Sequence, residues 1–183
     1  MLWLYILIAL LVLIIAIFIV YYNRFALLGN RVDNSLSQID VQLKRRADLV
    51  PNLMNTVKGY VKHEKQIFKQ LTDARKEIMT AKDLPTKMKA GNELQKALKT
   101  IFALAESTPE LKANQNFLEL QRELSAIEDK IAYSRQYYND SIQSYNNSSR
   151  TFPARFFYKF YRFKEKPYLQ IPAESKTVPK VEF

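Results

Sequence analysis

Cysteine is absent from the 183-residue sequence, and histidine occurs once, at position 63. Without cysteine the chain forms no disulfide and offers no thiol for lipid attachment. Metal sites built on several His or Cys ligands are excluded, including the di-iron site of helical bundles, which uses two histidines. A Ser-His-Asp triad would have to use His63, but this residue lies between Lys62 and Glu64 with no nucleophile elbow nearby. We therefore predict that His63 is a solvated surface residue.

Glycine is also scarce, with three residues in the whole chain. Sheet proteins rich in tight turns and loops that cradle phosphates both depend on glycine. The adjacent acids Glu128 and Asp129 diverge on a helix, so they do not form a ready acid/base pair. These absences predict an all-α protein that is not an enzyme and takes no metal, cofactor or small-molecule substrate.

Charge is missing from residues 1–22, MLWLYILIALLVLIIAIFIVYY, which also contain no Gly, Pro or side-chain amide. As a helix this run is ~33 Å long, close to the ~30 Å hydrocarbon core of a bilayer. Trp3 and Tyr5 near one end, and Tyr21 and Tyr22 at the other, suit the two headgroup levels. A cleaved signal peptide would need a basic start, a shorter apolar core and a small-residue cleavage site. We predict a transmembrane helix.

Positive charge follows the apolar run and none precedes it. Arg24 and Arg31 come first, and residues 44–46 add three more cations. The positive-inside tendency therefore predicts that the N-terminus lies outside and that residues 23–183 lie in the cytoplasm. The expected location is the cell (cytoplasmic) membrane, crossed once.

Apolar residues after the anchor recur in steps of three, four or seven, a pattern typical of long helices that pack as in a coiled coil. In the first predicted helix, from Asn30 to about Lys82, they are Val32, Leu36, Ile39, Leu43, Val50, Leu53, Val57, Tyr60, Ile67, Leu71 and Ile78. Pro51 interrupts this stripe. A proline removes one backbone donor and crowds the preceding turn, so we expect a kink there or two collinear helices.

A second helix is predicted from Thr86 to Glu106. Asp83 or Thr86 is a suitable N-cap, and Pro85 suits the first turn. Its apolar positions repeat at the same spacing as those of the first helix. The short connection before it favours antiparallel packing.

A third helix is predicted from about Glu110 to Tyr145. Ser107 and Glu110 have capping-box spacing, and Pro109 falls just inside. Three apolar stripes with short connections predict an antiparallel helical bundle over residues 30–149. The sequence leaves open whether the chain reverses at Pro109 or bends there and returns its C-terminal part to the membrane.

Four stretches carry a resemblance to a known family. They are Asn30 to Lys65 (NRVDNSLSQIDVQLKRRADLVPNLMNTVKGYVKHEK), Lys112 to Asn146 (KANQNFLELQRELSAIEDKIAYSRQYYNDSIQSYN), the Phe152-Pro153 pair and the ending Pro179 to Phe183. Together with the anchor they resemble the LemA family of bacterial membrane proteins over essentially the whole chain. The resemblance implies one membrane span followed by an antiparallel helical bundle. It implies no particular chemistry, although the family includes proteins tied to forming or shaping internal membranes. Relatives tend to have a milder, Gly-containing stretch after Phe-Pro, where this chain has RFFYKFYRF.

The net charge of +10 raises the possibility of a nucleic-acid partner. However, most basic residues of the predicted helices alternate with Asp and Glu, which describes a salt-bridged surface, so we predict no nucleic-acid binding. Candidate ion pairs across the bundle join the cations Lys44, Arg45 and Arg46 to Glu123, Glu128 or Asp129, with Asp33, Asp40 and Asp48 as further charged residues of the same network. They form either a solvated rim network or a docking surface for a protein partner.

The stretch TFPARFFYKFYRFKEKPY, residues 151–168, combines eight aromatic rings with five basic side chains. On a helix four cations fall within about 60° of one another, and the rings fill the opposite and flanking arc. Such a helix suits the interface of an anionic bilayer. The predicted interface residues are Arg155, Phe156, Lys159, Phe160, Arg162, Phe163 and Lys166. The alternative is that the rings cap the bundle as ordinary core.

The predicted organisation is a span (1–22), a juxtamembrane linker (23–29), the bundle (30–149), a basic-aromatic amphipathic segment (150–168) and an extended tail (169–183). We expect a non-enzymatic membrane scaffold or adaptor that organises or shapes the membrane through a second interfacial contact. The alternative is an accessory or regulatory subunit whose bundle docks a membrane enzyme or envelope protein. Expected partners are the bilayer, anionic headgroups, and a protein partner or a second copy of the chain.

Overall fold

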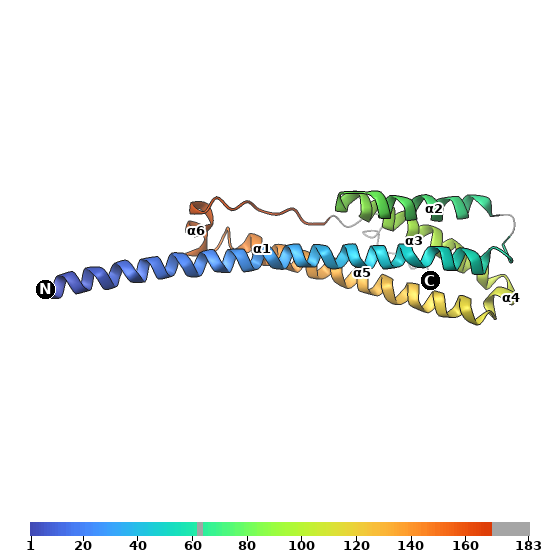
Figure 1. Cartoon of the computed structure of the whole chain (residues 1–183), viewed down its shortest axis with the longest axis horizontal. Helices are drawn as coiled ribbons and strands as arrows, with labels where there is room; N and C mark the ends of the chain where they lie inside the picture. The colour runs from blue at the N-terminus through green and yellow to red at the C-terminus, as the bar shows by residue number, and fades with distance from the viewer. Residues whose placement is uncertain (62–63, 170–183) are drawn as a thin grey trace, which may run out of the picture. The chain divides into compact units, whose positions relative to one another are not determined.

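The computed structural model describes residues 1–61 and 64–169, and within these ranges the chain is helical with no strand. The helices are α1 (Leu2–Val57), α2 (Lys65–Thr80), α3 (Leu84–Glu106), α4 (Pro109–Lys112), α5 (Gln115–Asn147) and α6 (Ala154–Phe160) (Figure 1). The predicted all-α class, with a long apolar N-terminal helix followed by packed helices, is confirmed. His63 and the predicted tail from residue 170 onward lie outside the described residues.

The chain forms two compact units. One combines Met1–Ser35 with Arg135–Phe183, and the other is Leu36–Ser134. Helices α1 and α5 each contribute to both units.

The core of the Leu36–Ser134 unit is the stripe that the sequence predicts. Its buried residues include Ile39, Leu43, Val50, Leu53 and Val57 of α1, Ile67, Leu71 and Ile78 of α2, Leu94, Leu98 and Ile101 of α3, and Phe117, Leu124, Ile127 and Ile131 of α5. Burying such side chains stabilises the fold by roughly 1.5–3 kcal/mol each. The spacing of apolar residues therefore identified the buried face of every long helix in this unit.

The prediction that the first helix reaches Lys82 is wrong. Helix α1 ends at Val57, residues 58–60 form a turn, and α2 starts at Lys65 and packs on α3. Gly59 lies in this turn, where the low helix propensity of glycine favours a break. Helices α1 and α2 both bury residues of the predicted stripe, so the apolar spacing continues across the turn although the helix does not.

Pro51 lies inside α1, which continues through it without division. Proline has no N–H, so the carbonyl of Ala47, four residues earlier, lacks its usual helical donor. The Nε–H of Arg75, on α2, donates to this carbonyl at 3.1 Å. A side chain from a neighbouring helix thus supplies the hydrogen bond that Pro51 cannot.

The predicted cap of the second helix is confirmed. The Asp83 carboxylate accepts a hydrogen bond from the backbone N–H of Thr86 at 2.8 Å, and Pro85 lies in the first turn. The hydrogen bond from Thr86 favours the charged carboxylate and lowers the pKa of Asp83. Helix α3 therefore begins where the sequence predicts, within two residues.

The predicted capping box of the third helix is wrong. The Ser107 hydroxyl instead donates back to the Leu104 carbonyl at 2.8 Å, and Pro109 opens only the four-residue helix α4. The cap of α5 is Asn114, whose side-chain oxygen accepts from the N–H of Phe117 at 3.1 Å. Asparagine is as good a cap as serine, but the sequence analysis did not name Asn114 as a cap.

Gly91 allows α3 and α1 to approach closely in this unit. A Cβ atom at Gly91 would lie 2.6 Å from Cδ2 of the fully buried Leu43. We expect Gly91→Val to lower the free energy of unfolding by about 1–3 kcal/mol, because the core must shift to admit the extra carbons. Urea unfolding of the full chain in a mild detergent, followed by circular dichroism, measures this.

The matched control is Lys99→Val, which adds the same residue at an exposed position of α3. Leu43→Ala should also remove the additional cost of Gly91→Val, since it removes the atom that clashes. A Gly91→Val protein as stable as the parent would show that the helices do not need this glycine.

In the unit formed by Met1–Ser35 and Arg135–Phe183, the end of α5 lies beside α1. A Cβ atom at Gly29 would lie 3.8 Å from the Tyr145 ring, and Phe25, Val32 and Ile142 are buried. Residues 23–29, predicted as a linker, are helical and continue the apolar run into the rest of α1. The chain after α5 therefore returns to the anchor helix.

Candidate membrane-interface site

The apolar run of α1 is exposed except at Phe18 and Tyr21, which are half-buried. Among the residues that the structure describes, α1 is the helix long and apolar enough to cross a membrane, and none of its apolar window is buried. Trp3 and Tyr5 are exposed at the start of the run. Tyr21 and Tyr22, predicted as the second aromatic belt, instead contact rings from α6 and the residues after it. The anchor is covered by protein only at this end.

Helix α6 packs on that end of α1 through aromatic rings. Phe157 stacks on Tyr21 with ring centroids 4.4 Å apart and meets Phe18 edge-on at 4.9 Å. Tyr158 meets Phe25 edge-on at 5.6 Å. Each such pair contributes about 0.5–1.5 kcal/mol beyond the burial of area. We call these residues the ring cluster: Phe18, Tyr21, Tyr22 and Phe25 of α1 with Phe156, Phe157, Tyr158, Phe160, Tyr161 and Phe163.

A hydrogen bond also joins the two segments. The Tyr161 hydroxyl donates to the backbone carbonyl of Phe18 at 2.9 Å. Within a hydrocarbon environment an unsatisfied hydroxyl is costly, and this bond satisfies it. The contact fixes the residues after α6 to the last turns of the apolar run.

Two predicted interface residues, Phe156 and Phe160, remain exposed beside the anchor. Their side chains are 58% and 60% accessible, and their ring centroids lie 6.5 and 5.1 Å from that of Phe18. These two rings therefore add exposed apolar surface beside that of α1. Phe152, at 91% accessible, is a further exposed ring that the sequence analysis did not single out.

The helical wheel fails after Phe160, where α6 ends. Arg162 has a positive φ of 57°, so the chain leaves the helix there, and Arg162 and Lys166 do not share a helical stripe with Arg155. Phe163, predicted at the lipid face, is half-buried against Phe25, with ring centroids 5.3 Å apart. The predicted segment over residues 150–168 therefore contains one short helix, α6, and an extended stretch after it. We call this stretch, residues 163–169, the strap.

Lys166 holds this strap to the helices. Its ammonium group lies 2.7 Å from an Asp33 carboxylate oxygen and 5.5 Å from the centre of the Tyr145 ring. The Asn146 side chain accepts from the Lys166 N–H at 3.0 Å and donates to its carbonyl at 2.9 Å. The Tyr138 hydroxyl donates to the carbonyl of Pro167 at 3.3 Å. The charge of Lys166 is thus committed within the protein.

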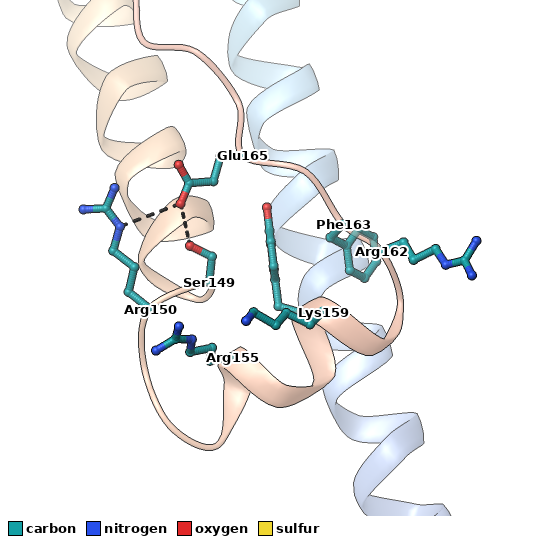
Figure 2. Close-up of a pocket in the computed structure, with 8 residues that line it drawn as sticks. Ser149, Arg150, Arg155, Lys159, Arg162, Phe163 and Glu165 are labelled. Carbon is teal, nitrogen blue, oxygen red and sulfur yellow. Dashed lines mark hydrogen bonds and ion pairs between the residues drawn. The ribbon is translucent and has the colours of Figure 1, made fainter.

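Arg155 and Lys159 are exposed and line a pocket of about 580 Å³, which we call the basic pocket. Its lining residues are Ser149, Arg150, Arg155, Tyr158, Lys159, Arg162, Phe163 and Glu165. Figure 2 shows Arg155 and Lys159 on the side of α6 that faces Arg150, whereas Arg162 points away from them. Burial raises the pKa of Tyr158 well above its ordinary value, so its hydroxyl keeps its proton at physiological pH.

Some of these residues could have been found from the sequence and others could not. Phe18, Tyr21 or Tyr22, and Phe25 continue the three-four spacing back from Val32, which signals a buried stripe inside the anchor. Ser149 and Arg150 follow the polar end of the third predicted helix, where no pattern distinguishes them. Over the described part of the chain, no group of three His, Cys, Asp or Glu residues could hold a metal ion.

The ion pairs predicted across the bundle form in part. Arg46 pairs with Glu128 at 2.5 Å, as one of the predicted combinations. Asp40 pairs with Lys87 at 2.6 Å and Asp33 with Lys166 at 2.7 Å, which are partners that the sequence analysis did not name.

Comparisons with known proteins agree with the resemblance noted in the sequence. A family model described as "LemA family" matches residues 35–183. Protein LemA of Metamycoplasma hominis is 28% identical over 127 residues, which cover 67% of this chain and 57% of that protein. Magnetosome proteins MamQ 1 and MamQ 2 of Paramagnetospirillum magneticum are each 24% identical over 182 residues, covering 85% of this chain and 67% of theirs. The chain thus spans little more than half of the LemA relative.

Proposed function

Because this chain belongs to the LemA family, we propose that it is a non-enzymatic membrane scaffold that organises or shapes the bilayer through two contacts. The first contact is the span formed by the apolar run of α1. The second is made by α6 and its exposed rings at the membrane surface. The rest of the chain lies in the cytoplasm in this proposal.

The position of Phe156 and Phe160 carries the proposal. Both rings lie against Phe18, which precedes the last residue of the apolar run, Tyr22, by about 6 Å along the helix. Interfacial helices bury their apolar side about 5–10 Å into the headgroup and acyl boundary. If the run spans the bilayer, these two exposed rings enter the acyl boundary.

The charges near the rings support the same orientation. Arg155 and Lys159 lie on the same short helix as the exposed rings, and both are exposed. The cytoplasmic leaflet carries anionic lipids, and each cation near it adds about 1 kcal/mol of attraction. A cytoplasmic bundle also agrees with Arg24 and Arg31, which follow the apolar run.

The names of the relatives support a structural role. Two are magnetosome proteins, and neither those names nor that of the LemA relative is the name of an enzyme. Since the chain covers only part of each relative, the role of those whole proteins is a guide to this one and no more.

The second contact can be tested by measuring the depth of a single label. The chain has no cysteine, so Phe156→Cys provides one attachment point for a fluorophore. In the full chain reconstituted into vesicles, we expect lipids brominated near the headgroup to quench this label strongly. The same label at Gln136→Cys, exposed on α5 of the same unit, should be quenched less, because it lies nine residues, about 14 Å along α5, before Tyr145, whose ring meets Tyr158 of the ring cluster.

Equal, weak quenching at both positions would remove the second contact from the proposal. Capture of one stoichiometric protein partner under those conditions would favour the alternative function, an accessory subunit that docks a membrane enzyme or envelope protein.

A further inference from the structure

The basic pocket has an excess of positive charge that the described residues do not balance. Arg155, Lys159 and Arg162 have no carboxylate within ion-pair distance among residues 1–61 and 64–169. Arg150 has one distant contact, from its Nε to Glu165 Oε1 at 3.7 Å. The same Glu165 oxygen accepts from the Ser149 hydroxyl at 2.7 Å, as Figure 2 shows. One carboxylate therefore accompanies three cations, Arg150, Arg155 and Lys159, since Arg162 points away from them (Figure 2).

The Tyr158 side chain forms an apolar wall of the pocket. It is 5% exposed, and its ring centroid lies 5.6 Å from that of Phe25 and 6.0 Å from that of Tyr145. The charge of a ligand would therefore meet the exposed cations and not this buried hydroxyl.

We propose that the basic pocket binds a phosphate group through Arg150, Arg155 and Lys159. Guanidinium groups bind phosphate oxygens with paired N–H donors, and a lysine adds a point charge. The pocket volume of about 580 Å³ admits a headgroup larger than phosphate itself.

The location of the pocket favours a phospholipid as the source of the phosphate. The pocket residues Arg155 and Lys159 alternate on α6 with Phe156 and Phe160, which lie against the anchor. A lipid phosphate bound to the cations would leave its acyl chains beside these rings. This lipid assignment rests on the proposed function, whereas the phosphate site itself does not.

Native mass spectrometry of the full chain, released from detergent micelles, can count bound lipids. We expect one phosphatidylglycerol molecule to be retained in preference to phosphatidylcholine. Arg155→Gln with Lys159→Gln should weaken this retention about tenfold or more, since it removes two charge-assisted contacts. The charge-matched control is Arg31→Gln with Lys164→Gln, two exposed cations outside the pocket, and should change retention by about twofold or less.

Glu165→Gln provides a test in the opposite direction. It removes the carboxylate that competes for Arg150 but keeps an oxygen that can accept from Ser149. We expect it to strengthen retention of phosphatidylglycerol severalfold. A variant that merely damaged the fold would weaken retention instead.

Soluble glycerophosphate identifies the source of the ligand. If it binds the parent as tightly as phosphatidylglycerol does and is lost in the Arg155 and Lys159 variant, the site holds and takes a soluble phosphate. If that variant and its charge-matched control bind both ligands alike, the phosphate site is refuted. Strong lipid quenching at residue 156 in that case would leave the proposed function intact.

Discussion

Replacing Leu11 and Ile15 with arginine is expected to release the protein from the membrane fraction. Both residues lie near the middle of the apolar run, one helical turn apart, and both are about half exposed. At the centre of a spanning helix, each Leu or Ile contributes about −0.3 to −0.6 kcal/mol and each Arg costs about 2.5–3.5 kcal/mol. The two exchanges shift insertion by about 6–8 kcal/mol, comparable with the whole favourable insertion energy of such a run. Alkaline extraction followed by flotation measures the loss.

The control exchanges the same positions without adding charge, as Leu11→Ile with Ile15→Leu. This variant keeps the apolar surface and should remain in the membrane fraction like the parent. If the arginine variant also resists alkaline extraction, the apolar run does not hold the protein in the bilayer. The bilayer would then have to be contacted by another part of the chain.

Glu128→Ala is expected to destabilise the Leu36–Ser134 unit although Glu128 lies partly at the surface. The Arg46 side chain is 4% exposed, and its Nη1 lies 2.5 Å from Glu128 Oε2. Removing one partner of a buried pair typically costs about 3–5 kcal/mol, because the remaining charge stays away from water. The Glu128 side chain is one-third exposed, so water compensates in part and we expect about 2–4 kcal/mol. Urea unfolding of the full chain in detergent measures the change.

The reciprocal variant separates charge burial from packing. Arg46→Met removes the buried charge and keeps most of the side-chain volume, while Glu128 can turn toward water. We expect this variant to lose about 1 kcal/mol or less. Equal losses for the two variants would mean that the pair acts through packing and not through the attraction between the charges of Arg46 and Glu128.

Much of the fold follows from local patterns in the sequence. The spacing of Ile39, Leu43 and Leu53 placed them in the core, and each is fully buried. Asp83 caps α3 as predicted, because a cap depends on only four consecutive residues. The end of α1 at Val57 was missed, since a chain that folds back can keep the same apolar spacing.

The candidate site was predicted less well than the fold. Phe156, Phe160, Arg155 and Lys159 lie on one short helix as expected, and all four are exposed. Phe163 and Lys166 are committed to contacts within the protein, with Phe25 and Asp33 respectively. Ser149 joins the site from the turn after α5, where the sequence carried no signal, and Arg150 opens the predicted basic-aromatic segment but was not among the predicted interface residues.

By itself the sequence determined what depends on neighbours along the chain: an uncharged run long enough to cross a bilayer, helices with one apolar face, and a segment that mixes rings with cations. Only the tertiary structure decided which rings are exposed and which cations are paired. The reason is that burial depends on partners distant in the chain. Phe157 is covered by Phe18 and Tyr21, and the Lys166 ammonium is held by Asp33. A helical wheel of residues 151–168 contains none of the partners Phe18, Tyr21 and Asp33.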